Sequence, residues 1–365
     1  MLNNKTIAVV VPAYNEEKQI GTVLKSMPDF VDRIVVVNDC SKDGTADIVT
    51  EFIKNDQSET LEIKNAMESV PENTYNRAEI VLQEQLRENI KYFVPSEIIN
   101  EDAEKDRIIL INLKRNAGVG AAIARGYKWC QDHDIDCSAV MAGDGQMDPA
   151  ELESICKPII EEEVDYVKGN RLIHRSAWLV IPKMRFLGNS ILSILTKIAS
   201  GYWHVSDSQT GYTAISSKAL GSIRLHKIYK GYGMPNDMLV KLNIAFCTIK
   251  EVEIKPIYDI GEKTKMNVFK VIPSISILLL KSFIKRLWIK YLFRDFHPLF
   301  IFYHFSFLLA FAMLPAIYKI AEAVIIDVNI SYQMLLLFIF LFMGSFQSLL
   351  FAMWMDIQDN ERLYK

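Results

Sequence analysis

The sequence predicts an α/β protein with a mostly parallel sheet flanked by helices, followed by interfacial helices and a two-helix transmembrane hairpin. Three observations support this class. Apolar, β-branched runs alternate with segments of helical periodicity along most of the 365 residues, which is typical of strand–helix–strand units. Three of the first four predicted strands end in turns rich in Gly, Asn and Asp. Two long apolar stretches lie near the C-terminus.

The first four strands are expected at residues 6–11, 34–37, 108–113 and 139–141. The first is a continuous β-branched run, as expected for a parallel strand that is covered on both faces. Helices are expected to follow the first three strands, ending near residues 27, 53 and 129. Beyond residue 149 we expect helices at 150–162 and 186–199, and strands at 165–169, 211–216 and 246–254.

Residues 54–107 interrupt this alternation. They are polar and charge-rich, with helical periodicity around residues 78–92. The segment is therefore interpreted as an insertion on the sheet, and its role cannot be inferred from its composition.

Composition narrows the choice of partners and compartment. The net charge is −3 and the pI about 6.1, so no global basic field indicates nucleic acid as a partner. The five cysteines are widely spaced and form no Cys-x-x-Cys pair, which favours a reducing compartment and argues against a zinc cluster. The N-terminus shows no secretory signal pattern, so the part preceding the apolar stretches is expected in the cytosol.

The two apolar stretches, residues 298–318 and 333–355, contain no formally charged side chain. A bilayer core of about 30 Å needs about 20 helical residues, so each stretch can span it. His304 and Pro315 are tolerable in the first span because helix packing can cover them. The alternative is a pair of buried core helices.

The flanking charges predict the orientation. Cations precede the first span, whereas the connection between the spans carries one Lys and two acids: Lys281, Lys285, Arg286, Lys290 and Arg294 against Lys319, Glu322 and Asp327. The positive-inside tendency then places the N-terminal domain and the C-terminal tail in the cytoplasm. Residues 272–293 are predicted to lie on the inner leaflet, with their cations toward anionic headgroups. The alternative is an amphipathic helix packed on the soluble domain.

These segments define four parts. Residues 1–265 form the predicted cytosolic catalytic domain, with 54–107 as its insertion. Residues 266–297 form the juxtamembrane helices, 298–355 the transmembrane helices and 356–365 a cytosolic tail.

The segment 141–149 is the strongest chemical signal. It follows a predicted buried strand and carries Asp144, Gln146 and Asp148 among glycines. Ligands of open α/β sheets bind just beyond the carboxyl ends of the strands. Oxygen ligands there suit Mg²⁺ or Mn²⁺ bridging to phosphate oxygens. The alternatives are a polar β-turn and, for Asp148, a cap of the next helix.

Two further turns suit a nucleotide. Asp39 follows the second strand and can bond a base or ribose edge, and backbone amides at residues 118–120 can face phosphate oxygens. A dinucleotide fingerprint does not follow the first strand, and the sequence contains no P-loop pattern.

Four motifs in this order resemble those of family 2 glycosyltransferases, particularly the dolichol-phosphate mannose synthase and polyprenyl-phosphate glycosyltransferase group. They are VVVPAYNEE (residues 9–17), VVNDCSKDGT (36–45), NAGVGAA (116–122) and DGQMDP (144–149). Three later segments are also similar to family motifs: KGNR (168–171), DSQTGY (207–212) and GEKTK (261–265). The resemblance covers residues 6 to about 265 apart from the insertion.

The resemblance implies a GT-A fold, a UDP- or GDP-sugar donor and a divalent cation, Mg²⁺ or Mn²⁺. It assigns the donor pocket to Pro12, Tyr14, Glu16, Asp39, Gly118 and Asp144. It assigns the metal to Asp144 and Gln146, the acceptor phosphate to Arg171, Arg185, Lys263 and Lys265, and the catalytic roles to Asp144, Arg171, Arg185 and Asp207. The group usually has Asp-x-Asp where this chain has Ala142-Gly143-Asp144, so contacts of the first carboxylate cannot be carried over.

The function predicted on this basis is a membrane-anchored, inverting glycosyltransferase that moves a sugar to a polyprenyl phosphate. A phosphate monoester has a second pKa near 6 and is largely dianionic at neutral pH, so it needs cations more than a base. A hydroxyl acceptor would need a base, for which Asp207 and Asp237 are the candidates. A catalytically silent membrane scaffold is a third alternative. The sugar, the nucleotide base, the lipid length and the oligomeric state are not predicted, although a homo-oligomer is compatible with the sequence.

Overall fold

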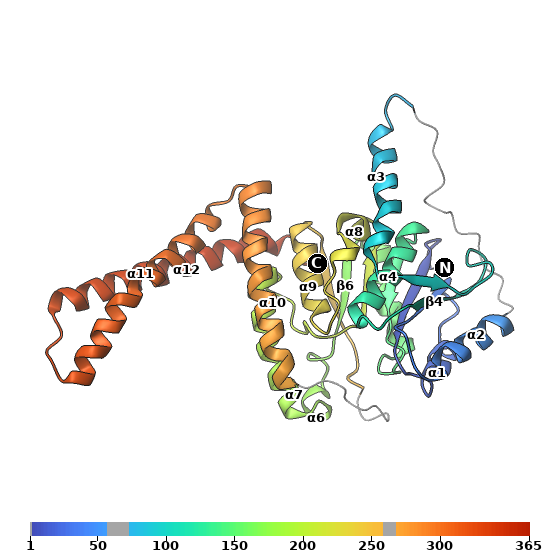
Figure 1. Cartoon of the computed structure of the whole chain (residues 1–365), viewed down its shortest axis with the longest axis horizontal. Coiled ribbons are helices and arrows are strands. Elements are labelled where there is room, and N and C mark those ends of the chain that lie inside the picture. Colours follow the sequence, from blue (N-terminus) through green and yellow to red (C-terminus); the bar gives the residue numbers. More distant parts are fainter. Residues whose placement is uncertain (1, 57–72, 258–267) are drawn as a thin grey trace.

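The computed structural model describes residues 2–56, 73–257 and 268–365 of the chain. Its centre is an eight-stranded sheet of order β3-β4-β2-β1-β5-β7-β6-β8 (Figure 1). Six strands run parallel, whereas β3 and β7 are antiparallel to their neighbours. The predicted class, a mostly parallel sheet flanked by helices, is confirmed. The strands are β1 (Ile7–Ala13), β2 (Arg33–Asn38), β3 (Ser96–Ile98), β4 (Ile108–Leu113), β5 (Cys137–Val140), β6 (Tyr166–Asn170), β7 (Thr213–Ser216) and β8 (Ile249–Glu253).

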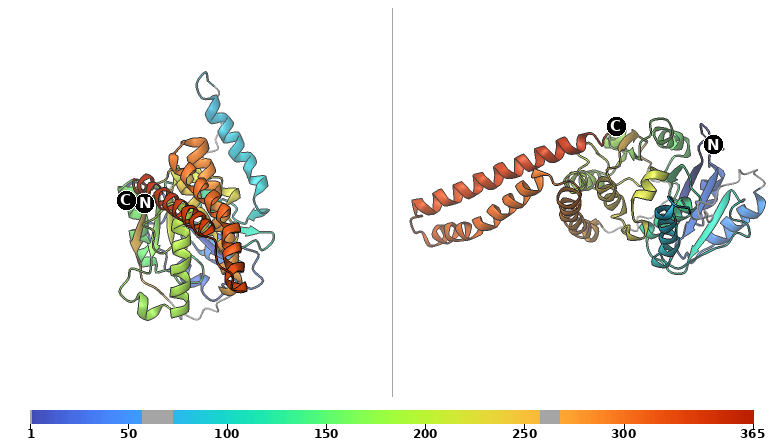
Figure 2. Two further views of the ribbon diagram at one scale, coloured as in Figure 1. Left: turned by 90° about the vertical axis from the view of Figure 1, so that its left-hand side faces the viewer. Right: turned by 90° about the horizontal axis from the view of Figure 1, so that it is seen from above.

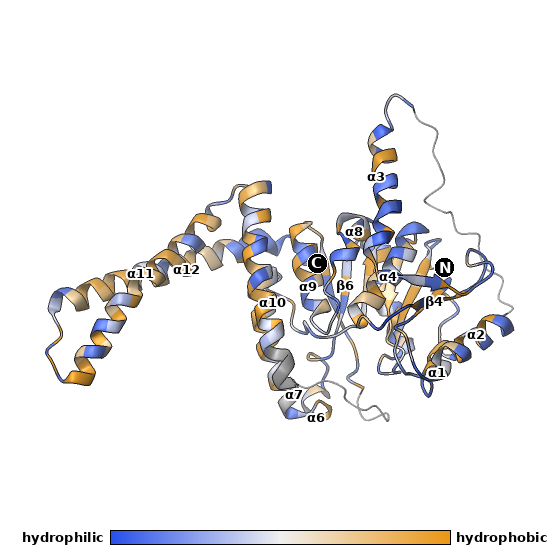
Figure 3. Cartoon of the chain, in the orientation of Figure 1, coloured by the Kyte–Doolittle hydropathy of each residue, from blue (hydrophilic) through white to orange (hydrophobic). Residues whose placement is uncertain are grey.

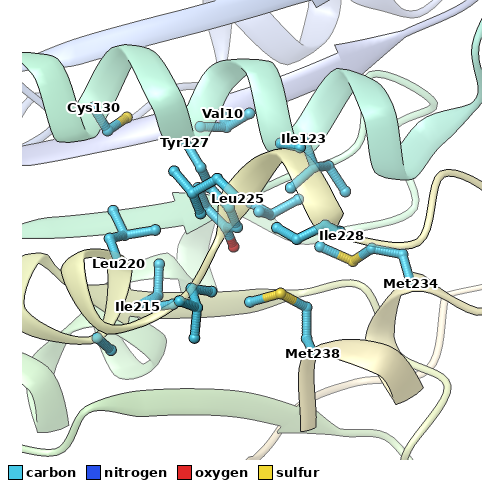
Figure 4. Packing of buried hydrophobic residues seen from close by; sticks show 14 of the residues in the cluster. Val10, Ile123, Tyr127, Cys130, Ile215, Leu220, Leu225, Ile228, Met234 and Met238 are labelled. Carbon is cyan, nitrogen blue, oxygen red and sulfur yellow. The ribbon is translucent and has the colours of Figure 1, made fainter. Parts of the chain in front are cut away.

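The central strand β1 is buried on both faces, as its continuous apolar run predicts. Ala8 and Val10 face one apolar core, which lies beneath α4 and extends to Met234 and Met238 (Figure 4). Ile7, Val9 and Val11 face the second core on the opposite side of the sheet. Alternate side chains of β1 therefore contribute to the apolar cores on the two faces of the sheet.

Helices cover both faces of the sheet. They are α1 (Ile20–Lys25), α2 (Thr45–Asn55), α4 (Val119–Asp132), the turn η2 (Pro149–Glu151), α5 (Leu152–Glu161), α6 (Ala177–Val180), α7 (Lys183–Ser200), α8 (Ser217–Ser222), the turn η3 (Leu225–Lys227) and α9 (Met234–Ile244). The sequence indicated α1, α2, α4, α5 and α7. It did not indicate the short α6 and α8, or α9.

The insertion is helical where its periodicity predicts. Helix α3 (Arg77–Glu88) stands out from the body of the molecule (Figure 1) and has no buried residue, whereas Tyr92 of the following turn η1 (Asn89–Tyr92) contacts His226 of η3. Strand β3 was not predicted. It is three residues long, half to fully exposed, and pairs with the edge of β4.

The C-terminal part consists of α10 (Val268–Trp288), the π-helical turn η4 (Ile289–Arg294), and a hairpin of α11 (Pro298–Ile326) and α12 (Tyr332–Glu361). The hairpin extends away from the sheet and is largely apolar (Figures 2 and 3). In the most apolar stretch of each helix only 17% and 6% of the residues are buried. Helices of a soluble core would be mostly buried, so the two-helix membrane hairpin is the better interpretation.

Two cations of α10 and η4 do not lie where the sequence predicts. Arg286 and Lys290 are completely buried instead of facing lipid headgroups, because they lie in a polar cluster with residues of α12. One apolar face of α10, including Leu279 and Leu287, packs against the catalytic domain, as the alternative interpretation proposed. A second face presents Leu280 and other large apolar side chains outward.

The chain after the hairpin is not a free tail. Leu363 is buried in the core beneath α4. The amide of Ile249 donates to the carbonyl of Leu363 at 2.8 Å, and the amide of Lys365 donates to the carbonyl of Ile249 at 3.0 Å. Residues 356–365 therefore pack on the catalytic domain and extend the edge of the sheet at β8.

Candidate active site

The carboxyl ends of β4, β2, β1 and β5 lie at one edge of the sheet, because these neighbouring strands are parallel. The loops that follow them, residues 114–118, 39–44, 14–19 and 141–148, therefore meet there. Strand order reverses between β1 and β5, since β2 and β4 lie to one side of β1 and β5 to the other. Such a reversal opens the ligand crevice of α/β sheets. The four motifs indicated by the sequence thus converge at one edge.

The loops after β1 and β2 are tied together by side chains. The amide of Asn15 donates to Ser41 Oγ at 2.9 Å, and the amide of Lys42 donates to Asn15 Oδ1 at 2.8 Å. The amide of Glu16 donates to Thr45 Oγ1 at 3.0 Å. This network positions the segment that carries Pro12, Tyr14 and Glu16 beside the loop after β2. Their contact with a donor nucleoside stays a prediction.

Asp39 connects the end of β2 with the start of α4. Its buried carboxylate accepts the amides of Ala117 at 2.7 Å and Gly118 at 2.8 Å. Burial raises the pKa of Asp39 above its ordinary value, and the two amides oppose this shift. Each oxygen already has one protein donor, so a base or ribose contact would use the remaining lone pairs.

The glycines before α4 serve a close backbone approach. A Cβ at Gly118 would lie 2.6 Å from the carbonyl oxygen of Lys230, and one at Gly120 would lie 2.0 Å from that of Tyr229. The amide of Gly120 donates to the Lys230 carbonyl at 2.9 Å. The amides of Ala117, Gly118 and Gly120 have protein acceptors, which disfavours the prediction that this segment cradles phosphate oxygens. The assignment of Gly118 to the donor pocket stays a prediction.

Asp144 lies in a tight turn at the reversal point. Its Oδ1 accepts the amide of Gln146 at 3.1 Å, and Gly145 has a φ of +75°, a conformation in which glycine is favoured. The amide of Gly143 donates to the carbonyl of Pro12 at 3.2 Å, which places this turn against the first motif. Asp148 caps the following turn by accepting the amide of Ala150 at 2.9 Å, as the capping alternative predicted.

The residues of this turn fit a cation that also binds a diphosphate. Asp144 and Gln146 are both half-buried at the edge of the sheet and offer a carboxylate and an amide oxygen. No group of three or more His, Cys, Asp or Glu side chains suited to a metal occurs among the described residues. Mg²⁺ often takes only one or two protein carboxylates and completes its shell with phosphate oxygens and water. A single carboxylate is therefore compatible with a shared site, but not with an all-protein cage.

Arg171 and Asp207 form the second half of the site. Arg171 follows β6, and its Nε and Nη2 donate to the two oxygens of Asp207 at 2.8 and 3.1 Å. Asp207 also accepts the backbone amides of Arg171, Gln209 and Thr210 at 3.2 Å each. Its side chain is fully buried, whereas that of Arg171 is 22% exposed. The two neighbouring donors of the Arg171 guanidinium, which could bind two oxygens of a phosphate, thus bind Asp207.

The surroundings of Asp207 disfavour a role as a base. Burial alone would raise its pKa, but the Arg171 guanidinium, with help from Lys168, holds the pKa of Asp207 below its ordinary value. Burial lowers the pKa of Lys168 to about 8, and its Nζ donates to the carbonyl of Thr210. Five donors already contact the oxygens of Asp207, which disfavours it as a base, and its catalytic role stays a prediction.

Asp237, the other candidate base, is also engaged. Its Oδ2 accepts the amide of Tyr229 at 2.7 Å and the Nζ of Lys241. It thereby holds the loop that passes over Gly118 and Gly120. Both carboxylates proposed for a hydroxyl acceptor thus have structural contacts in the described part of the chain, which disfavours them as bases.

The segment 207–212 also contacts the predicted metal turn, since Tyr212 Oη donates to the carbonyl of Asp148 at 2.9 Å. Lys263, Lys265 and the side chain of Arg185 lie outside the described residues, so their predicted contacts with the acceptor phosphate stay predictions.

The sequence did not indicate a role for Glu251. It accepts the amides of Ser206 and Asp207 from β8, and an acid inside a short strand gives no local signal of that role.

Comparisons with known proteins identify a family for most of the chain. The family model described as "Glycosyl transferase family 2" matches residues 8–65 and 58–224. A UDP-N-acetylglucosamine–dolichyl-phosphate N-acetylglucosaminyltransferase of Methanococcus voltae is 28% identical over 256 residues, covering 70% of this chain and 87% of that protein. An uncharacterized protein of Methanocaldococcus jannaschii is 26% identical over 258 residues, covering 70% of this chain and 84% of its own.

Among solved structures, glucosyl-3-phosphoglycerate synthase from Mycobacterium tuberculosis in complex with uridine diphosphate aligns with 78% of this chain and 80% of its own. The identity is 16% and the TM-score 0.46.

Proposed function

Because the chain belongs to glycosyltransferase family 2, we propose that it transfers a sugar from a UDP- or GDP-sugar to a polyprenyl phosphate, with inversion, at the cytoplasmic face of a membrane. The relative from Methanococcus voltae, whose name gives a UDP-sugar donor and a dolichyl-phosphate acceptor, supports both substrate classes. The apolar hairpin of α11 and α12 supports a lipid acceptor, because it would keep the site near the bilayer.

The observation that carries the choice of acceptor is the engagement of Asp207 and Asp237. A hydroxyl acceptor must lose its proton to a base as the new bond forms. Both candidate carboxylates are buried and hydrogen-bonded in the described part of the protein. A phosphate dianion needs no such base above its second pKa of about 6. The geometry therefore favours a phosphate over a hydroxyl.

In the proposed reaction an oxygen of the acceptor phosphate attacks the anomeric carbon of the donor. The bond from that carbon to the diphosphate breaks in line, and the nucleoside diphosphate leaves with the electron pair. Asp144 and Gln146 would hold the Mg²⁺ or Mn²⁺. The cation would neutralise charge on the leaving diphosphate.

Arg171 would attract the acceptor phosphate, but not through a full bidentate fork. Its Nε and Nη2 are directed at Asp207, which fixes the guanidinium plane. The positive charge remains partly exposed. Arg185, Lys263 and Lys265 stay proposed as further cations at this phosphate.

Within the residues that the structure describes, the contacts of Asp207 and Asp237 disfavour the hydroxyl-acceptor alternative. The silent-scaffold alternative rests on Ala142 alone, whereas family membership and the Asp144 turn favour an enzyme. The cytoplasmic orientation and a homo-oligomeric state stay predictions.

Donor binding can be tested by a thermal-shift screen of UDP- and GDP-sugars with and without Mn²⁺. A ligand that binds only the native state at 100 times its dissociation constant stabilises it by about 2.7 kcal/mol. We expect at least one nucleotide sugar to raise the melting temperature only when the metal is present. Absence of a metal-dependent shift for every nucleotide would contradict the donor assignment.

A further inference from the structure

A buried polar cluster connects the membrane hairpin with the catalytic domain. We name it the junction cluster; its members are Asn243 of α9, Arg286 of α10, Lys290 and Tyr291 of η4, and Asp356 and Asn360 of α12. All six are at most 3% exposed. Asp356 directly follows the apolar stretch of α12, so the cluster lies where the hairpin meets the catalytic domain.

Arg286 is the centre of this cluster. Its Nη1 and Nη2 each donate to one oxygen of Asp356 at 2.7 Å. Its Nε and Nη2 donate to the carbonyls of Ala199 and Ile198 at 3.0 Å, and Nη1 also contacts Tyr291 Oη at 3.4 Å. The five N–H donors of the guanidinium are thus all used.

The two carbonyls belong to the last turn of α7, where carbonyls lack partners within the helix. A cation is favoured at this end of a helix. Gly201, which ends α7 with a φ of +80°, leaves the room that Arg286 needs, because a Cβ there would lie 2.3 Å from Arg286 Nη1. The end of α7 is therefore fixed to the hairpin through one side chain.

Helix α7 in turn holds the segment 207–212. Ser193 Oγ lies 3.1 Å from Ser208 Oγ and accepts the Ser208 amide at 3.3 Å. Thr196 Oγ1 and Gln209 Nε2 both donate to Asn236 Oδ1, at 3.0 and 2.9 Å. Asp207 directly precedes Ser208 and Gln209 in the chain, and its carboxylate orients Arg171. Side-chain hydrogen bonds at both ends of α7 thus connect Asp356, through this helix, with the segment of the proposed acceptor site.

Stability alone is a poor reason for such a pair. A fully buried ion pair loses its hydration, and well-packed apolar side chains of similar volume are often as stabilising or more so. The geometry of a bidentate pair, by contrast, fixes the relative position of the elements that carry it. The Arg286–Asp356 pair joins α10 to α12, and the bonds from Arg286 to two carbonyls attach the end of α7 to both.

We propose that Arg286 and Asp356 are positioning residues of the transfer reaction. They fix the end of α7 against the membrane hairpin, and α7 in turn holds segment 207–212 and Arg171 in place for the acceptor phosphate. This inference rests on the proposed function for its kinetic consequence, but the coupling itself can be measured without any reaction. The hairpin is then a part of the active-site scaffold as well as an anchor.

The test uses full-length protein in lipid vesicles, in two variants. The first, Arg286→Met with Asp356→Leu, keeps the volume of the pair and removes its polar contacts. The second, Asp356→Asn, keeps the shape and removes one charge. Lys281→Gln, at an exposed position of the same helix α10, is the matched control.

We expect kcat/KM for the polyprenyl phosphate to fall about tenfold in both variants, as expected for coupling through a packed network. The KM for the donor should stay within about twofold. Amide hydrogen exchange of residues 207–212 should become about tenfold faster, whereas that of residues 39–44 should not change. The control should behave as the wild type.

An unchanged exchange rate at 207–212 in either folded variant would overturn the proposal. Loss of a melting transition in both variants would also overturn it, because the pair would then be required for folding and not for positioning. If the wild type transfers no sugar to a polyprenyl phosphate, the proposed function fails. The exchange measurement still decides the coupling in that case.

Discussion

Replacing Asp144 with alanine is expected to lower sugar transfer by a factor of about 100 or more, by analogy with the loss of other groups that stabilise developing charge. Asp144 supplies the one carboxylate of the turn at the reversal point, and Ala142 offers no substitute. The fold should persist, since the residue is half-buried and its Oδ1 accepts an amide within a local turn. Transfer to polyprenyl phosphate and the melting temperature are the two measurements.

Asp148→Ala is the matched control, because this acid lies in the same segment but caps the turn that precedes α5. Loss of a cap costs about 1 kcal/mol of stability, with transfer largely retained. Full activity in Asp144→Ala would overturn the assignment of the metal site. So would an equal loss of activity in both variants.

Arg171→Ala is expected to destabilise the protein by about 3–5 kcal/mol, because it leaves the completely buried Asp207 carboxylate without its guanidinium partner. It should also abolish transfer if Arg171 attracts the acceptor phosphate. Unfolding in denaturant and the transfer rate measure the two effects. Arg175→Ala, in the same loop and exposed, is the control.

The destabilisation should depend on pH with a definite sign. In the wild type the pKa of Asp207 is lower in the folded state than in the unfolded state. Its contribution to the free energy of unfolding is therefore fully present above the unfolded pKa and is lost as the pH falls through the folded pKa. In Arg171→Ala, burial without a partner raises the pKa of Asp207, so the folded state gains protons as the pH falls. The difference in stability between the two proteins should therefore shrink from pH 7 toward pH 5. A constant difference would contradict the ion-pair account.

Much of the fold follows from local patterns. The apolar run of β1 and the turns rich in Gly, Asn and Asp after β2, β4 and β5 are local signals of the sequence, so this edge of the sheet was predictable. Parallel neighbours then bring those turns together without further information. The GT-A-like class is supported by the sheet order and by membership in the family.

The features that the sequence did not indicate are interactions between distant parts of the chain. Arg286 has the sequence context of a membrane-facing cation, and its partner Asp356 is 70 residues away. Asp207 has the sequence context of a base, and only the structure shows five donors around it. The amides before α4 fit a phosphate nest until the Lys230 carbonyl and Asp39 are placed beside them. In each case the sequence shows the group but not the group that satisfies it.

The most direct test of the proposed function compares a polyprenyl phosphate with the corresponding polyprenol as acceptors, with the nucleotide sugar and metal selected by binding. Product is identified by mass spectrometry over pH 5 to 7. We expect a sugar phosphodiester of the lipid from the phosphate alone, at a rate that rises through the second pKa of the acceptor, about 6. Transfer to the polyprenol at a comparable rate would contradict the account, because it would require a base, and the contacts of Asp207 and Asp237 disfavour both.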